Sequence, residues 1–280
     1  MLIGAVVVLF NPDAREINNI KSYISVVGQI IILDNSQNDN FNLIKNNLFE
    51  YKDLIVYRHF KENIGLAKAL NIGIHHLFEL GYEWALVMDS DSSFLSNVVE
   101  EYRDYLEHEP GIDTVAILAP VHIYDRSKAT EFDGNRLVDW AMTSGCLFNI
   151  KIFIKNNGFN ENLFVDGLDI DYCYKIAEKG YQTIQCGHAL LKHFPGSTQS
   201  FRLFHKELFR YGSASPDRYY LQSKALVWII LRYHRPKEYI RLLSKWGKII
   251  LLFKNKKQYI DMMLKGSKEG VSLWKKYKIN

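Results

Sequence analysis

Two carboxylates, Asp89 and Asp91, end an apolar run that begins at Trp84. A run of this length, preceded by Gly81 and followed by polar residues, is typical of a buried strand in a parallel sheet. The carboxyl ends of such strands line the ligand crevice of open α/β sheets. Two aspartates spaced i and i+2 on an extended segment point to the same side. One can then bind a hard divalent cation while the other orients a sugar or ribose hydroxyl, although such a pair also simply ends strands and caps helices.

A second acidic group places Asp166, Asp169 and Asp171 within six residues, at the start of a helix expected over 170–179. The helix dipole favours acidic residues at this position, and capping accounts for one or two of them. A carboxylate next to a second carboxylate is a candidate general base. The group therefore predicts acid–base chemistry as well as a helix start.

Alternating strands and helices must position these residues. Short apolar runs predict strands over 2–10, 29–34, 54–57, 84–89 and 114–119. Helical spacing predicts helices over 13–27, 42–50, 64–80 and 96–107. This alternation indicates an α/β fold with helices on both faces of a parallel sheet. After Pro120 the pattern loosens, with strands expected over 140–148 and 182–186.

Composition narrows the class of protein. The 280 residues, 48% of them apolar, suffice for one large or two small domains with a real core. No apolar run is long enough for a membrane-spanning helix, and the first residues lack the basic region of a signal peptide. Three cysteines without C-x-x-C spacing indicate neither a disulfide framework nor a zinc site. A reducing cytoplasm is expected.

The last 49 residues are strongly basic. From Arg232 onward, 14 Lys and Arg stand against three acidic residues, a net charge of +11, whereas residues 1–231 carry −7. An amphipathic helix is expected here, with Arg241, Lys245 and Lys248 on its polar face. Its apolar face is expected to hold Tyr239, Leu242, Leu243, Trp246, Ile250 and Phe253. This pattern favours an interfacial helix on anionic lipid, with packing on the sheet as the alternative. No nucleic-acid partner is expected, because no reading motif accompanies the charge.

Further motifs accompany the acidic residues in a fixed order. They are Asn11-Pro12, Asp34-Asn35-Ser36, the stretch 63–71 (NIGLAKALN), the pair Asp89 and Asp91, the stretch 164–173 and His193-Phe194-Pro195-Gly196-Ser197. This series resembles the inverting family 2 glycosyltransferases with the GT-A fold, and most of all the bacterial rhamnosyltransferases. The resemblance extends from residue 1 to about residue 230.

The resemblance implies a fold and a division of the chain. It implies a GT-A type, mostly parallel central sheet flanked by helices over 1–230, with a nucleotide-binding half (1–120) and an acceptor half (121–230). A basic, amphipathic helical extension would then occupy 231–280.

The resemblance also implies roles for particular residues. The nucleotide sugar would be bound by Phe10, Asn11, Asp34, Asn63, Gly65, Asn71 and Asp89. A Mg²⁺ or Mn²⁺ ion would be held by Asp91, Asp89 and His193. The acceptor side would include Trp140, Thr143, Ser144 and Gly145. Asp169 would be the catalytic base with Asp166 in reserve, because Leu168 occupies the position where the family often has its first acid.

The implied function is inverting transfer of a sugar, L-rhamnose from dTDP-L-rhamnose, onto a glycan or lipid-linked glycan during cell-surface polysaccharide synthesis. The enzyme would be cytoplasmic and peripherally bound to the inner face of the cell membrane through its C-terminal helices. One alternative is a UDP-galactofuranose or UDP-hexose transferase of the same fold. More distant alternatives are a haloacid-dehalogenase-type phosphatase, in which the first Asp of the pair would be the nucleophile, and a non-catalytic carbohydrate binder.

Overall fold

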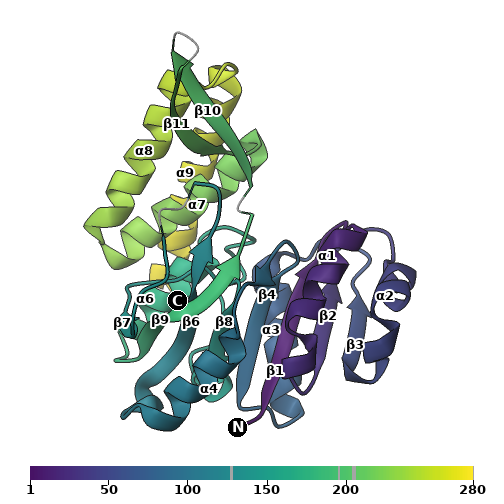
Figure 1. Ribbon diagram of the computed structural model, residues 1–280. Helices are drawn as coiled ribbons and strands as arrows, with labels where there is room; N and C mark the ends of the chain where they lie inside the picture. The colour runs from purple at the N-terminus through teal and green to yellow at the C-terminus, as the bar shows by residue number, and fades with distance from the viewer. Residues whose placement is uncertain (127–128, 195, 204–205, 280) are drawn as a thin grey trace.

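The computed structural model describes residues 1–126, 129–194, 196–203 and 206–279. Within these residues, a nine-stranded mixed sheet forms the centre of an α/β fold, and helices cover both of its faces. The strands follow the order β3-β2-β1-β4-β8-β6-β9-β5, with β7 paired to β9. A two-stranded hairpin and the last three helices form a separate layer above the β6 and β9 end of the sheet (Figure 1).

The first half of the sheet consists of parallel strands joined by helices. Its strands are β1 (Ile3–Leu9), β2 (Ile30–Asp34), β3 (Ile55–His59) and β4 (Trp84–Asp89). Its helices are α1 (Ala14–Asn19), α2 (Phe41–Leu48), α3 (Leu66–Glu79) and α4 (Val98–His108). Successive side chains of a strand point to opposite faces. Val6 accordingly packs in the core that α3 covers, while Val7 packs in the core beneath α1 and α4.

The second half mixes parallel and antiparallel pairing. Its strands are β5 (Ser93–Phe94), β6 (Val115–Ile123), β7 (Asn135–Leu137), β8 (Cys146–Asn149) and β9 (Gln182–Lys192). Its helices are α5 (Ile150–Lys155) and α6 (Leu168–Ala177). Strand β8 runs antiparallel to both β4 and β6, whereas β6 and β9 are parallel. The expected mostly parallel GT-A type sheet is confirmed, with β8 and the short strands β5 and β7 as its antiparallel members.

The C-terminal layer begins with the hairpin of β10 (Ser197–Leu203) and β11 (Lys206–Ser213). Helices α7 (Pro216–Tyr233), α8 (Pro236–Leu252) and α9 (Lys256–Ile279) follow. The side chain of Ser215 caps α7, and Pro216 occupies its first turn, where a missing N–H costs nothing. None of the helices in the described part of the chain combines the length and apolar character needed to cross a bilayer.

Several elements differ from expectation. The segment 13–27 is α1 followed by two 3₁₀ turns, Ile20–Ser22 and Ile24–Val26. The expected strand over 140–148 starts only at Cys146, while β9 continues to Lys192. The hairpin was not predicted, and the domain boundary expected at residue 230 falls inside α7.

The expected face assignment of α8 is wrong. Arg241, Lys245 and Lys248 lie on its partly buried inner side, and Phe253, just past its end, is only 8% exposed. The solvent-exposed side instead carries Tyr239, Ile240, Leu243, Ile250 and Leu251. The reason is a buried polar contact, because Glu238 accepts a hydrogen bond from the hydroxyl of Tyr174 at 2.8 Å and pairs with Arg241 at 3.1 Å. This contact turns the charged face towards the protein.

Candidate active site

A three-residue group lies at the carboxyl end of β4. Ligand atoms of Asp89, Asp91 and His193 all lie within 4.8 Å of one another. Asp89 is the last residue of β4, and Asp91 follows in the turn. His193 follows the end of β9, and its backbone N–H donates to the carbonyl of Ile123 at the end of β6. Pairing of β9 with β6 thus brings His193 to a pair of carboxylates about a hundred residues away in sequence.

The donor set of this group suits a divalent cation. His193 Nδ1 lies 3.2 Å from Asp91 Oδ1 and 2.8 Å from Ser92 Oγ. Burial raises the pKa of Asp89 to about 6, an effect that His193 opposes and Asp91 reinforces. Burial lowers the pKa of His193, but the hydrogen bond to Asp91 and the charges of both aspartates outweigh it, so the pKa is raised. Two carboxylates and an imidazole are suitable ligands for Mg²⁺ or Mn²⁺.

The buried segment 143–145 supports the end of β4. Ser144 is fully buried, and its hydroxyl accepts a hydrogen bond from the backbone N–H of Asp89 at 3.0 Å. Gly145 has a φ of +77°, and a Cβ there would lie 2.8 Å from Pro120, so only glycine fits. Ser144 therefore supports the acidic pair, and the acceptor-side role expected for Ser144 and Gly145 stays a prediction. Thr143 is also buried.

His122, which sequence analysis did not single out, lies behind the group. Its ring packs edge-on against His193 at 5.9 Å, and its Nε2 lies 2.8 Å from the carbonyl oxygen of Ser144. Burial lowers its pKa to about 4, so the ring is neutral at pH 7. A single histidine within an apolar strand gives no local signal of such a position.

A direct contact joins the nucleotide-binding half to the acidic loop. Gly65 has a φ of +89°, and a Cβ there would lie 2.6 Å from the ring of Phe164. The N–H of Leu66, the first residue of α3, donates to the carbonyl of Phe164 at 2.7 Å. Glycine at position 65 thus lets the loop that leads to Asp166 and Asp169 lie against the start of α3.

The three aspartates of this loop have different surroundings. Asp171 accepts hydrogen bonds from the indole N–H of Trp228 at 2.7 Å and the hydroxyl of Tyr233 at 3.0 Å, which fastens α6 to α7. Asp166 forms an ion pair with Arg218 at 3.0 Å. Asp169 accepts a hydrogen bond from the backbone N–H of Ile170 at 2.8 Å, and burial raises its pKa to about 6. Asp169 is therefore the carboxylate best suited to accept a proton near neutral pH.

Cations from the C-terminal helices surround these carboxylates. Burial raises the pKa of both Asp166 and Asp89, and the charge of Arg218 of α7, which pairs with Asp166, partly lowers each. Lys245 of α8 also lowers the pKa of Asp166, and burial lowers the pKa of Lys245 itself to about 8. Arg218 was not named from the sequence, and Lys245 was expected to face solvent. A sequence shows which residues share a face of a helix, but not which face packs against the protein.

The expected acceptor side is partly assembled by α8. The guanidinium of Arg241 lies 4.7 Å from the ring centre of Trp140, an arrangement typical of a cation–π contact. Arg241 also lowers the pKa of Asp169, although burial of Asp169 outweighs it. Trp140, Arg241 and Asp169 are therefore neighbours, whereas Thr143 lies in the interior.

The predicted nucleotide-binding residues lie near the carboxyl ends of β1 and β2 and the start of α3. Phe10 is 55% exposed, and its ring is available for stacking. Asn11 adopts a φ of +51°, and its N–H donates to Ser36 Oγ at 2.7 Å. Asn63 accepts the N–H of Gly65 at 3.0 Å. These residues lie near one edge of the sheet, and their binding of the nucleotide stays a prediction.

Two predicted nucleotide ligands are engaged within the protein. Asp34 is fully buried, and its oxygens accept hydrogen bonds from Ser36, Asn40 and Tyr57. Asn71 uses its amide to hold Phe159 and the side chain of Glu161, so it organises that loop. Both residues thus support their loops, and their predicted contact with the nucleotide stays a prediction.

Comparison with known families decides the class of protein. A family model described as glycosyl transferase family 2 matches residues 19–212. The chain belongs to this family. One relative, the dTDP-rhamnosyl transferase RfbF of Shigella flexneri, is 25% identical over an alignment of 198 residues. The alignment covers 64% of this chain and 64% of the relative.

Solved structures share the fold. S. aureus TarS superposes with a TM-score of 0.60 and 12% identity over 98% of this chain and 50% of TarS. A structure of GalNAc-T7 with UDP, GalNAc and Mn²⁺ superposes with a TM-score of 0.59 and 12% identity, over 97% of this chain and 56% of that one. TarS 1–349 in complex with UDP-GlcNAc superposes with a TM-score of 0.59 and 11% identity, over 98% of this chain and 84% of that structure. At these identities the likeness establishes the shared fold alone.

Proposed function

We propose that the protein transfers L-rhamnose from dTDP-L-rhamnose, with inversion, to a hydroxyl of a glycan or lipid-linked glycan in cell-surface polysaccharide synthesis. Membership of glycosyltransferase family 2 supports transfer of a sugar from a nucleotide donor. The observation that carries the proposal is the convergence of Asp89, Asp91 and His193, together with a buried carboxylate, Asp169, in the first turn of α6. The rhamnosyl donor is favoured by the name of the Shigella relative.

Asp91, Asp89 and His193 would hold a Mg²⁺ or Mn²⁺ ion, which as a Lewis acid would stabilise the charge that develops on the leaving nucleoside diphosphate. The Mn²⁺ in the GalNAc-T7 structure is consistent with this choice of cation. The hydrogen bond from the backbone N–H of Asp89 to Ser144 would fix the end of β4 beside the cation.

Asp169 would remove the proton of the acceptor hydroxyl as that oxygen attacks the anomeric carbon. An oxocarbenium-like centre makes this attack possible for a base of modest strength. Arg218 would occupy Asp166 through its ion pair and leave Asp169 as the proton acceptor. The indole of Trp140 and the guanidinium of Arg241 would flank the acceptor sugar.

A donor panel tests the proposal. Purified protein with Mn²⁺ is mixed with dTDP-L-rhamnose, UDP-galactofuranose or a UDP-hexose and a lipid-linked acceptor, and sugar transfer is measured by mass spectrometry. We expect product with dTDP-L-rhamnose. Transfer from a UDP donor alone would favour the second candidate, which the UDP-GlcNAc complex of TarS makes reasonable. Phosphate release without transfer would indicate a phosphatase, and binding without turnover a carbohydrate binder.

Cation binding is expected to stabilise the protein more at pH 7.5 than at pH 5.5. The pKa of Asp89 is raised from 3.8 to about 6, so without a cation its buried charge costs stability as pH rises through about 6. The raised pKa of His193 acts in the same direction, because the stability it supplies below 6.5 is lost at higher pH. The melting temperature is measured with Mn²⁺ and with EDTA at both values of pH. If Mn²⁺ raises the melting temperature equally at pH 5.5 and pH 7.5, the assignment of the cation to these residues is contradicted.

We also propose that the exposed side of α8 lies on an anionic membrane surface. Ile240, Leu243 and Leu251 are 67%, 69% and 77% exposed on this side. Exposed cations flank them at both ends of the helix, including Lys237 and Lys254. An apolar stripe between clusters of positive charge matches the interface of an anionic bilayer. Phe253, which we expected to insert, packs against Tyr219 and Tyr259 instead.

Replacing Leu243 and Leu251 together with glutamate is expected to weaken vesicle binding by at least about tenfold, because two apolar side chains leave the bilayer. Co-sedimentation with vesicles that contain phosphatidylglycerol measures the effect. Phe49→Glu is the matched control, since Phe49 is 60% exposed in the turn that follows α2, in the nucleotide-binding half. If both proteins sediment alike, the tail does not anchor through this face.

A further inference from the structure

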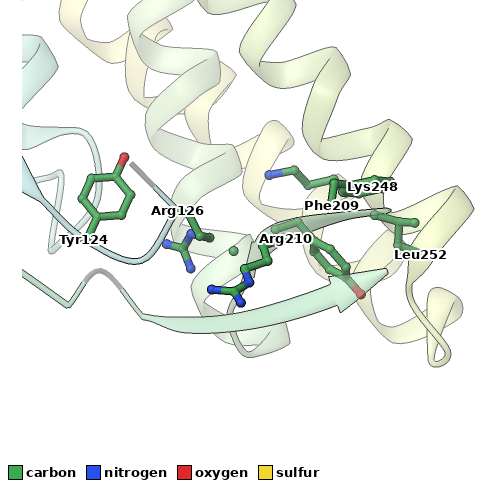
Figure 2. Close-up of a pocket in the computed structure, with 8 residues that line it drawn as sticks. Tyr124, Arg126, Phe209, Arg210, Lys248 and Leu252 are labelled. Atoms are coloured by element: carbon green, nitrogen blue, oxygen red, sulfur yellow. The ribbon is translucent and has the colours of Figure 1, made fainter. Parts of the chain in front are cut away.

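Apart from the candidate active site, a pocket lies between α8, the hairpin and the segment that follows β6. Its volume is about 410 Å³. Its walls include Tyr124, Arg126, Phe209, Arg210, Lys248 and Leu252. Figure 2 shows Lys248 and Leu252 reaching from α8, with Arg126 and Arg210 on the segments across from them. Three cations and two apolar side chains thus share one cavity.

The positive charge of this pocket is only partly balanced. Arg210 forms an ion pair with Glu207 at 2.8 Å. Lys248 is half-buried, and it has no hydrogen bond or ion pair with any residue that the structure describes. Burial and the charge of Arg126 both lower the pKa of Lys248. A partly buried cation without a counter-charge is costly, and an anionic ligand would relieve that cost.

Arg126 is held in position for such a ligand. Its guanidinium donates to the carbonyl oxygen of Ser197 at 3.2 Å and to Thr198 Oγ1 at 2.7 Å, both on β10. It also lies against the backbone of Gly212 on β11, where an added Cβ would contact it at 3.2 Å. A guanidinium fixed in this way has little conformational freedom left to lose when it binds an oxyanion.

The pocket adjoins the candidate active site on its acceptor side. Tyr124 follows Ile123, whose carbonyl accepts the N–H of His193. Lys245, whose charge acts on Asp166, lies one helical turn before Lys248 on the same side of α8. A molecule whose hydroxyl reaches Asp169 could therefore extend along α8 into this pocket.

We infer that the pocket binds a phosphate or diphosphate group carried by the acceptor. The inference rests on the proposed transfer function and names the chemistry of its acceptor. Arginine and lysine bind phosphate oxygens strongly when partly desolvated, and arginine can do so with two parallel bonds. The apolar side chains of Phe209 and Leu252 suit the first carbons of a lipid attached to that phosphate. The donor's own diphosphate is assigned to the metal group.

Binding of inorganic diphosphate in EDTA tests the site without loading the metal group. Isothermal titration calorimetry compares the full chain with Lys248→Gln, Lys248→Arg and the control Lys151→Gln, since Lys151 is exposed on α5. Loss of one charge-assisted hydrogen bond is expected to weaken binding about tenfold or more in Lys248→Gln. Lys248→Arg and Lys151→Gln should bind nearly as the parent does.

Farnesyl diphosphate, used as a second probe, distinguishes the two sources of the phosphate. If farnesyl diphosphate binds more tightly than inorganic diphosphate, and Lys248→Gln weakens the binding of both, the acceptor group is lipid-linked. If the two probes bind equally, the phosphate belongs to the glycan. Equal affinity of the parent and Lys248→Gln for both probes would overturn the inference. Mn²⁺-dependent binding of dTDP is measured in the same proteins, so that a failure of this pocket is separated from a failure of the proposed donor chemistry.

Discussion

Asp169→Asn lowers kcat by about two to four orders of magnitude, the expected result of removing a general base. Asparagine keeps the shape of the side chain and its hydrogen bond from Ile170 but cannot accept the proton. The raised pKa of Asp169 also predicts that the activity of the parent falls as pH drops below about 6, where the base is protonated. Initial rates from pH 5 to 8 at saturating donor measure both effects.

Stability separates this result from damage to the fold. The ionised form of Asp169 is disfavoured by burial, so the neutral asparagine should melt at the same temperature as the parent or higher at pH 7.5. Asp171→Asn is the matched control on the same helix. It should keep kcat and lower the melting temperature, because Asp171 binds Trp228 and Tyr233. A larger loss of kcat in Asp166→Asn than in Asp169→Asn would move the base to Asp166.

Asp91→Ala is expected to reduce turnover by about three orders of magnitude or more. A bound cation supplies several kcal/mol of charge stabilisation in the transition state, and each 1.4 kcal/mol corresponds to about tenfold in rate. Removing Asp91 leaves Asp89 and His193 as the remaining members of the group. The variant should also lose the Mn²⁺-dependent part of its affinity for dTDP.

Turnover in Mn²⁺ and in EDTA, together with dTDP titrations, measures these losses. Asp53→Ala serves as the control, since Asp53 is an exposed acid between α2 and β3. Near-parent activity of Asp91→Ala, or activity of the parent that EDTA leaves unchanged, would remove the cation from the mechanism.

Local sequence signals were sufficient for the parallel half of the fold. The apolar run that ends at Asp89 and the helix that begins after Gly65 are marked by neighbouring residues, and both lie where expected. The hairpin of β10 and β11 is largely exposed and lacks the alternation of a half-buried strand, so its pattern did not indicate strands.

The candidate site depends on contacts that local patterns do not encode. The resemblance supplied His193, but only the pairing of β9 with β6 explains its approach to Asp91. Arg241 and Lys245 looked like solvent-exposed residues of an amphipathic helix. Their true direction depends on Glu238, which is buried against Tyr174, and a single acidic residue in a basic segment does not reveal that contact.

In the proposed membrane orientation, the two faces of α8 would set the height of the site above the lipid. One face carries exposed Leu243, and the opposite face carries Lys245 and Arg241 beside the acidic loop. An α-helix with its side chains is about 10–12 Å across. A protein lying on lipid through this helix would hold its acceptor site roughly one helix diameter from the surface. The enzyme would therefore extend glycans only while they are short, and it would leave hydroxyls far from the lipid anchor unmodified.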